Sequence, residues 1–435
     1  MSSTNTSTKR QWIAEQAREH PERAFTTLHR FIDLEWMQEA YRLTRKDGAA
    51  GIDGVTAADY EKDLEANLLD LLGRIKSGSY FAPPVRRHYI PKADGTTRPL
   101  GIPTFEDKVA QRAIVMLLEP VYEADFLPCS HGFRPGRSAH DALHAVREGV
   151  MEGKRWVIDA DISKYFDTIS HKHLREFLDL RIKDGVVRKI LDKWLKAGVL
   201  EEGVLQRTGK GTPQGGVISP LIANTFLHYV LDQWFVETVR PRLQGRSLLV
   251  RYADDAVMLF ENDRDGQRVL AVLGKRLERY GLRLHPDKTR YLDFRPNRPR
   301  GRGKGAAFDF LGFTHYWVRT RKGNSTVRQT TAKSRLARAL RAVNEWCRRH
   351  RHDAVPKQWA HLASVLRGHG NYYGLRGNSV RLSSFRYQVT HIWRKWLSRR
   401  SGKSRLNWAK MRELLRRYPL PRPRVLPATT APLFP

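Results

Sequence analysis

The chain has 435 residues, of which 40% are hydrophobic, so it can bury a large core and is not globally disordered. Its two cysteines, Cys129 and Cys347, exclude a four-cysteine zinc site and a disulfide framework, and no apolar run reaches membrane-spanning length. The net charge of +33 is uneven, because residues 295–435 hold 33 Lys and Arg against 4 Asp and Glu, whereas residues 1–294 hold 45 against 41. This density predicts a polyanionic partner for the last third of the chain.

The first hundred residues predict helices followed by a basic hairpin. Residues 11–45 carry apolar side chains at helical spacing, and the glycines of residues 48–54 then form either a plain loop or a close backbone approach to a ligand. Residues 85–91 and 96–100 predict two strands, with Lys92 and Arg98 flanking the turn between them. Such charges are common beside turns, but a basic hairpin also suits a nucleoside triphosphate. The predicted inward residues of the helices are Trp12, Phe25, Leu28, Phe31 and Leu34.

A structural helix and a glycine-rich loop come next. Residues 104–126 predict a helix, because Thr104 to Asp107 resembles a capping box and an apolar stripe follows. Residues 131–138 form a Gly/Pro loop with two arginines, Arg134 and Arg137, and a second helix is expected at residues 139–152. The apolar stripe consists of Val109, Ala113, Met116 and Leu117.

Three carboxylates stand at the ends of predicted strands. Residues 156–162 predict a strand that ends at Asp161, and residues 248–260 predict a hairpin with Asp254 and Asp255 at its tip. Acidic residues are also typical of solvated turns. If the strand lies beside the hairpin, however, the three carboxylates can hold two metal ions about 3.5–4 Å apart, an arrangement that supports nucleotidyl transfer.

The remaining segments alternate loops with helices. Residues 209–220 concentrate Gly and Pro before an apolar helix at residues 221–234. Gln214 is the polar side chain of that loop that is long enough to contact nucleic acid or phosphate. Helices are expected at residues 171–200 and 265–280. A flexible basic loop at residues 295–307 precedes residues 308–313, which resemble a known hairpin.

The last third predicts a small helical bundle. Three amphipathic stripes of apolar residues, with arginines between them, begin near Leu336, Leu382 and Leu406. Residues 366–374 are expected to lie between the first two helices, and residues 419–435, with six prolines, predict an unstructured tail.

Three motifs occur in order: Asp161-Ile-Ser-Lys-Tyr-Phe-Asp167, Thr212-Pro-Gln-Gly-Gly216 and Tyr252-Ala-Asp-Asp255. Together they resemble a group II intron-encoded reverse transcriptase/maturase over about residues 48–400. The resemblance implies an α/β right-hand polymerase with fingers, an antiparallel palm sheet and a C-terminal all-α thumb or maturase bundle. The implied domains are an N-terminal helical extension at residues 1–60, fingers and palm at 61–320, a helical RNA-binding thumb at 321–418, and the tail. With two cysteines, the paired-cysteine nuclease module of many relatives is not expected.

The resemblance also implies roles for individual residues. Asp161, Asp254 and Asp255 would be catalytic and would hold two Mg²⁺ ions together with the backbone carbonyl of Ile162. Phe166 would reject a 2′-hydroxyl, although core packing also explains a phenylalanine there. The other implied nucleotide-binding residues are Lys92, Arg98, Gln214 and Lys288. The implied nucleic-acid contacts are Arg134, Arg137, Gly312, Arg367, Tyr372 and Tyr373.

The implied function is DNA synthesis on an RNA template from a DNA primer and deoxynucleoside triphosphates, together with binding of structured intron RNA and help in its splicing. In a bacterial source this implies a cytoplasmic, nucleoid-associated ribonucleoprotein without a membrane partner. Two alternatives remain open, which are an RNA-binding splicing cofactor with secondary or lost polymerase activity and a host-adopted reverse transcriptase for repair or defence. A homing nuclease is disfavoured by the missing cysteine pairs. The sequence predicts neither the oligomeric state nor the particular RNA.

Overall fold

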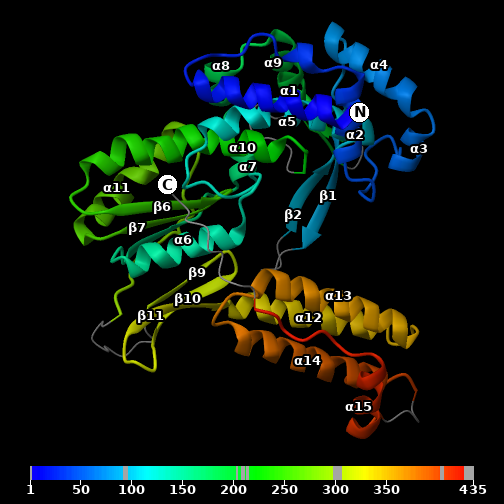
Figure 1. The fold of residues 1–435 in the computed structure, drawn as a ribbon, viewed down its shortest axis with the longest axis vertical. Coiled ribbons are helices and arrows are strands. Elements are labelled where there is room, and N and C mark those ends of the chain that lie inside the picture. The colour runs from blue at the N-terminus through cyan, green and yellow to red at the C-terminus, as the bar shows by residue number, and fades with distance from the viewer. Residues whose placement is uncertain are drawn as a thin grey trace. The chain divides into compact units, whose positions relative to one another are not determined.

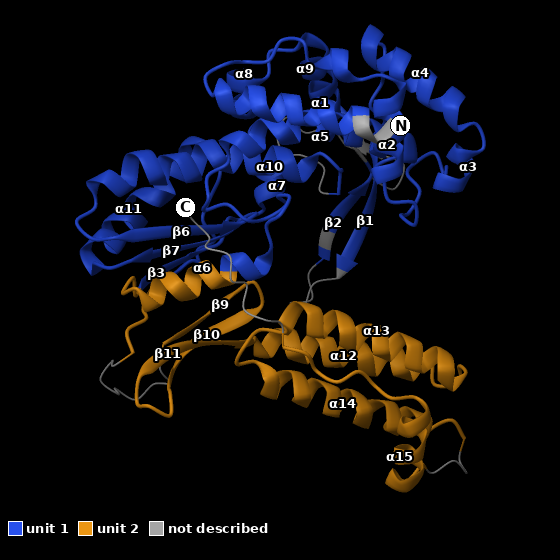
Figure 2. Ribbon diagram, viewed as in Figure 1, with its two compact units in different colours: residues 1–142, 156–291 blue, residues 143–155, 292–435 orange. Residues whose placement is uncertain are grey.

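A computed structural model describes residues 2–91, 97–201, 204–206, 211, 215–296, 306–401 and 406–425. The chain forms two compact units, residues 1–142 with 156–291 and residues 143–155 with 292–435 (Figure 2). The second unit thus combines a short segment, residues 143–155, with the chain from residue 292 onward. Among the described residues, no helix is both long and apolar enough to cross a membrane.

Helices open the first unit, as the apolar spacing predicted. They are α1 (Ser2–Glu19), a 3₁₀ turn (Leu28–Phe31), α2 (Leu34–Leu43), α3 (Ala57–Glu61) and α4 (Leu64–Ser77). Asp33 caps α2 by accepting a hydrogen bond from the backbone N–H of Trp36. Phe25 and Leu28 are buried as predicted, but Trp12 was wrongly predicted to point inward, because it is 46% exposed on α1.

The predicted basic hairpin is confirmed. Strands β1 (Val85–Pro91) and β2 (Thr97–Ile102) pair antiparallel, and short strands β4 (Val199–Glu201) and β5 (Val204–Gln206) extend their sheet in the order β2-β1-β4-β5. Helix α5 (Phe105–Asp125) follows at once, and the Thr104 hydroxyl accepts a hydrogen bond from Asp107 N at 3.2 Å. The whole predicted apolar stripe of α5 is buried.

A four-stranded sheet carries the predicted acidic strand and hairpin (Figure 1). Its order is β6-β7-β3-β8, from β6 (Ser247–Tyr252), β7 (Asp255–Phe260), β3 (Trp156–Ala160) and β8 (Arg290–Asp293). Strand β7 runs antiparallel to both β6 and β3, which confirms an antiparallel palm sheet.

Several helices lie between the strands of this sheet along the chain. They are α7 (Tyr165–Thr168), α8 (His171–Arg181), α9 (Gly185–Lys196), α10 (Ser219–Leu227) with π-helical continuations to Val239, and α11 (Asp263–Arg279). The predicted helical segment at 171–200 forms two helices, because Asp184 caps α9 by accepting hydrogen bonds from Val186 N and Val187 N.

The second unit contains a small sheet. Helix α6 (Ala139–Met151) contacts it through Gln329, whose side-chain amide donates to Leu143 O at 2.6 Å. The sheet order is β11-β10-β9, from β9 (Ala307–Phe310), β10 (Phe313–Arg319) and β11 (Ser325–Thr331). The predicted hairpin near 308–313 is confirmed, and its two-residue turn has positive φ at Leu311 (49°) and Gly312 (78°).

A helical bundle completes the second unit. Its helices are α12 (Lys333–Arg349), α13 (Val355–Tyr373), α14 (Ser379–Leu397) and α15 (Trp408–Arg417), packed around Trp393, Phe385 and Met411. Residues 366–373 lie between α12 and α14, as predicted, but they form the end of a further helix, α13, which the three predicted stripes did not include. The tail also begins packed against the bundle, because Leu420 is buried and Trp359 Nε1 donates to Pro419 O at 3.0 Å.

Candidate active site

The sheet register brings two of the predicted catalytic acids to opposed positions. Ala160, the last residue of β3, pairs with Ala256 of β7. Asp161 directly follows Ala160 and Asp255 directly precedes Ala256, so the two acids stand across from each other at the same end of the sheet. Asp254 lies in the turn between β6 and β7, where Tyr252 pairs with Asp255. The prediction that the strand lies beside the hairpin is therefore confirmed.

Backbone contacts fix the position of Asp161. Its carbonyl accepts a hydrogen bond from His285 N at 2.8 Å, and Ile162 forms an isolated antiparallel bridge with Leu284. Lys288 Nζ lies 3.8 Å from Asp161 Oδ2, and the Lys288 side chain is 59% exposed. Lys288, one of the predicted nucleotide-binding residues, is thus beside the first predicted catalytic acid.

The donor chemistry of this edge fits a divalent metal ion. Carboxylate and carbonyl oxygens are the ligands that Mg²⁺ prefers, and the three acids are partly or fully exposed to an incoming ion. Within the described ranges, however, no group of three or more His, Cys, Asp or Glu side chains is gathered closely enough to hold a metal ion. The backbone therefore places the predicted ligands at one edge of the sheet, whereas their side chains do not form a complete cage.

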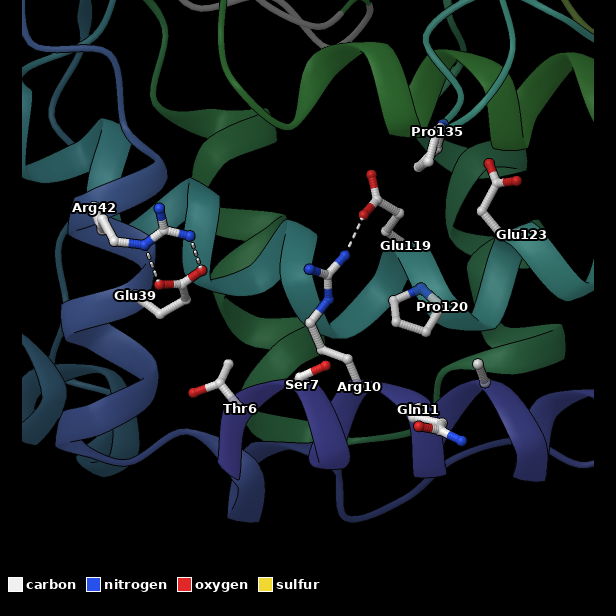
Figure 3. A pocket seen from close by; sticks show the side chains of 11 residues that line it. Thr6, Ser7, Arg10, Gln11, Glu39, Arg42, Glu119, Pro120, Glu123 and Pro135 are labelled. Carbon is white, nitrogen blue, oxygen red and sulfur yellow. Dashed lines mark hydrogen bonds and ion pairs between the residues drawn. The ribbon is translucent and has the colours of Figure 1, made fainter. Parts of the chain in front are cut away.

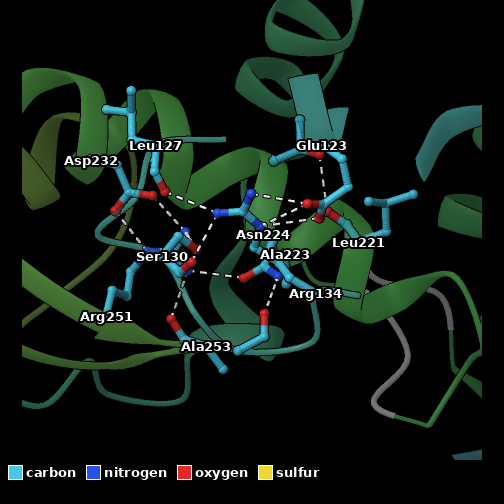
Figure 4. Close-up of polar contacts among 12 residues, drawn as sticks. Glu123, Leu127, Ser130, Arg134, Leu221, Ala223, Asn224, Asp232, Arg251 and Ala253 are labelled. Carbon is cyan, nitrogen blue, oxygen red and sulfur yellow. Dashed lines mark hydrogen bonds and ion pairs between the residues drawn. The ribbon is translucent and has the colours of Figure 1, made fainter. Parts of the chain in front are cut away.

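A buried arginine, Arg251, holds the β6–β7 turn in place (Figure 4). Arg251 is fully buried, and its Nε and Nη2 donate to Asp232 at 2.7 and 2.6 Å. Its Nη1 donates to Asn224 Oδ1 and to Ala253 O, both at 2.9 Å, and its Nη2 donates to Ser130 Oγ at 2.7 Å. Burial opposes the charge on Arg251, but the attraction of Asp232 outweighs it, so the pKa of Arg251 is raised.

The turn is also wedged against the loop at residues 131–137. Ala253 has a left-handed φ of 57°, and a Cβ added to Gly132 would lie 2.4 Å from Ala253 N. Asn224 Nδ2 donates to Gly132 O at 2.6 Å, and His131 N donates to Arg251 O at 2.8 Å. This support was missed from the sequence, where the only signal was one arginine inside an apolar strand.

Arg134, for which the resemblance implied a nucleic-acid contact, is bonded within the fold. Its side chain is 5% exposed, and its guanidinium donates to both carboxylate oxygens of Glu123 at 2.9–3.1 Å. Its Nη1 also donates to Leu127 O and Ser130 O at 2.9 Å. Because these donors are used inside the fold, Arg134 anchors the loop. Arg137, three residues later, is half-buried, and its role stays a prediction.

The structure describes only some of the predicted nucleotide-binding residues. Lys92 and Gln214 lie outside the described residues, and Arg98 stands in β2 opposite Ile90. Phe166 is five residues beyond Asp161. Its ring is partly buried against the core, and its centroid lies 5.4 Å from that of the Tyr165 ring. Their roles stay predictions.

The residue after Gln214 lies close to the basic hairpin. Gly215 has a φ of 119°, which favours glycine, and a Cβ there would meet Gly101 O of β2 at 2.4 Å. The backbones of the two predicted nucleotide-binding segments are therefore in direct contact.

In the second unit, the two predicted RNA-contacting tyrosines support the β9–β10 turn. The Tyr372 hydroxyl donates to Leu311 O at 2.9 Å, and the Tyr373 ring lies 5.1 Å from Phe313. A Cβ on Gly312 would meet the Tyr373 hydroxyl at 3.0 Å. Arg367 is exposed on α13. A contact of these residues with RNA remains a prediction.

A cavity of about 700 Å³ lies among α1, α2 and α5 (Figure 3). Its charged side chains are largely matched, because Arg10 pairs with Glu119 at 2.7 Å and Arg42 with Glu39 at 2.6 Å. None of the three predicted catalytic acids lines this cavity. The candidate active site is therefore the open sheet edge.

Comparisons with known proteins agree with this geometry. The family model described as "Reverse transcriptase (RNA-dependent DNA polymerase)" matches residues 90–315. The chain is 35% identical to Protein YkfC of Escherichia coli K12, over 71% of this chain and 88% of that protein. It is 39% identical to the group II intron-encoded protein LtrA of Lactococcus lactis, over 52% of this chain and 38% of that protein. It is also 38% identical to the putative COX1/OXI3 intron 2 protein of Saccharomyces cerevisiae, over 35% of this chain and 18% of that protein.

The chain belongs to the reverse transcriptase (RNA-dependent DNA polymerase) family. Its fold is a right-hand polymerase, and its activity is RNA-directed DNA polymerisation. The intron-encoded relatives indicate the group II intron reverse transcriptase/maturase type within this family.

Proposed function

We propose that DNA synthesis takes place where β3 ends beside the β6–β7 turn. Asp161, Asp254 and Asp255, with the carbonyl of Ile162, would hold two Mg²⁺ ions there. The observation that carries this proposal is the register of Ala160 with Ala256, which sets Asp161 across from Asp255. Metal ions bound at this edge would activate the primer 3′-hydroxyl and neutralise charge on the triphosphate.

The chain's own residues would orient the incoming deoxynucleotide. Lys92 and Arg98 bind the phosphates, and Gln214 contacts the base pair that is being formed. The contact between Gly215 and Gly101 supports this grouping, because it joins the two segments that carry these residues. Lys288, beside Asp161, donates a proton to the departing pyrophosphate.

Phe166 excludes ribonucleotides in this account. Its half-buried ring forms an apolar wall that has neither space nor a hydrogen-bond partner for a 2′-hydroxyl. The short distance in sequence from Asp161 supports a place beside the sugar of the incoming nucleotide.

We also propose that the basic second unit binds structured intron RNA and helps it to splice. Residues 295–435 hold 33 of the 78 Lys and Arg but only 4 of the 45 Asp and Glu. Such an excess favours phosphate contacts. The exposed Arg367 and the partly exposed Tyr372 are candidate contacts on α13.

Primer extension on an RNA template tests the metal assignment. We expect wild type to extend the primer with Mg²⁺, to stop on chelation and to recover when Mg²⁺ is returned. Asp161→Asn should remove synthesis, because a neutral amide replaces a charged ligand at the sheet edge. Glu65→Gln, which neutralises an exposed acid on α4, should retain it. Synthesis that survives chelation, or that persists in Asp161→Asn, would overturn the proposal.

A further inference from the structure

The loop at residues 131–137 holds a large apolar side chain in an unfavourable state. Phe133 has a φ of 56°, in the left-handed region, and its side chain is 57% exposed. This backbone conformation costs a bulky residue folding free energy. Because the ring is largely exposed, it buries little apolar surface that could offset this cost. Such outliers cluster at sites where a ligand makes use of them.

Both neighbours of Phe133 are fixed, so the loop cannot relax. On one side, Gly132 is pressed against the backbone of Ala253, where any Cβ would clash at 2.4 Å. On the other side, Arg134 is buried and bound to Glu123 and to two backbone carbonyls. The same interactions that hold the loop therefore hold the Phe133 ring outward.

The ring is held next to the β6–β7 turn (residues 252–255), which is the proposed catalytic turn. Its centroid lies 6.4 Å from that of Tyr252, and the two rings are tilted by 39°. Tyr252 precedes Asp254 by two residues and pairs with Asp255 across the hairpin. An exposed aromatic face therefore contacts the end of β6 that leads into the turn carrying Asp254.

We propose that Phe133 is a stacking surface for the nucleobase of the primer–template nearest the catalytic turn. This inference rests on the proposed function. Every nucleobase has a flat π face, so an aromatic side chain can bind it without reading sequence. We assign the ring to the primer–template, because the proposed triphosphate contacts stand on β2 and the adjoining loop, whereas Phe133 contacts Tyr252 of β6.

Three substitutions separate stacking from a structural role. Phe133→Ala removes the ring but keeps the Cβ in the left-handed conformation. Phe133→Gly removes the ring and also relieves the backbone strain. Phe133→Tyr keeps the aromatic face. Leu180→Ala is the control, because it removes an exposed apolar side chain (53%) from α8.

Three quantities are measured on the full chain: the Kd of a fluorescent RNA–DNA primer–template without nucleotide, the KM for deoxynucleotide, and the melting temperature. We expect Phe133→Ala and Phe133→Gly to raise that Kd about tenfold, within the range known for base stacking on aromatic residues. Phe133→Tyr and Leu180→Ala should leave it near wild type. Phe133→Gly should melt no lower than Phe133→Ala, because glycine accepts the positive φ.

Two results would overturn the inference. One is an unchanged Kd in Phe133→Ala; if the KM for deoxynucleotide rises instead, the ring contacts the incoming nucleotide. The other is a loss of binding that only follows a lower melting temperature, with Phe133→Gly melting lowest, which would make the ring structural. Because the Kd is measured without catalysis, binding through Phe133 by a protein that makes no DNA would refute the proposed function and leave this inference standing.

Discussion

Arg251 shows how one residue inside the fold sets the position of the β6–β7 turn, which carries Asp254. It is the centre of a buried cluster in which one guanidinium bonds to an acid, an amide, a hydroxyl and the carbonyl of Ala253. Removing one partner of a buried ion pair leaves the other charge without compensation, and this costs about 3–5 kcal/mol.

We therefore expect Arg251→Leu to lower the free energy of unfolding by about 3–5 kcal/mol, measured by urea denaturation. The double variant with Asp232→Leu should lose less than the sum of the single losses, because no charge is left unpaired. Arg246→Leu is the matched control, since Arg246 pairs with Glu261 at the surface and is 61% exposed, and should cost under about 1 kcal/mol. Equal losses from Arg251→Leu and Arg246→Leu would show that the buried cluster is not the main support.

The second residue-scale prediction concerns sugar selection. Phe166→Ala should admit ribonucleotides and reduce discrimination against them at least about tenfold, because the apolar wall is gone. Phe166→Tyr keeps the wall and should discriminate like wild type. Incorporation of each nucleotide type on the same RNA template measures this. If Phe166→Ala discriminates as well as wild type, the sugar filter is another residue.

At the scale of elements, α5 links the hairpin region to the loop that carries Gln214. Asp107 of α5 is fully buried and accepts hydrogen bonds from the Tyr80 hydroxyl, Trp194 Nε1 and Gln111 Nε2. Gln111 Oε1 in turn accepts a hydrogen bond from Ile218 N at 3.2 Å. The NH₂ group and the oxygen of the Gln111 amide therefore both form hydrogen bonds, and the bond to Ile218 N fixes the start of α10.

Burial raises the pKa of Asp107 to about 6, although its hydrogen bonds act to lower it. The folded state then holds this proton more tightly than the unfolded chain does, so the stability that it contributes is complete below about pH 4 and is lost as the pH rises through about 6. The unfolding free energy of wild type should fall by about 3 kcal/mol relative to Asp107→Asn between pH 4 and pH 7. Denaturation curves at several pH values measure this difference. A difference that stays constant, or grows with pH, would contradict the shift.

The sequence predicted elements well where the signal is local. The β3 strand, the β6–β7 hairpin and α5 follow from short apolar patterns and from the cap at Thr104. The sequence did not predict the direction of side chains that depends on packing against other parts of the fold. Arg134 turns inward because Glu123 lies on α5, and Trp12 turns outward on a helix whose spacing did not reveal its buried face.

The candidate site shows the same division. Asp161, Asp254 and Asp255 could be named from motifs, and the sheet then brought two of them into opposed register. Their supports, Arg251 and Gly132, could not be named, because a buried ion pair and a close backbone approach depend on interactions between separate segments.

At the scale of the molecule, the uneven charge predicts that the last third of the chain carries most of the binding of structured RNA. We expect binding of structured RNA to weaken steeply with salt. Arg412→Gln with Arg416→Gln on α15 should lower the slope of log K against log salt by about 0.7–0.9 for each phosphate that the protein no longer neutralises. Both arginines are exposed. The matched control, Arg18→Gln with Lys62→Gln in the first unit, should keep the wild-type slope. A control pair that lowers the slope as much would refute this division.

The most direct test of the account measures DNA synthesis and RNA-template binding on the same preparation of Asp254→Asn and of wild type. The substitution removes one charge from the β6–β7 turn and changes none of the groups that accept hydrogen bonds from Arg251. We predict that the variant binds template as wild type does and makes no DNA with Mg²⁺ and deoxynucleotides. Substantial synthesis by a folded Asp254→Asn protein would contradict the assignment of this sheet edge as the polymerase site.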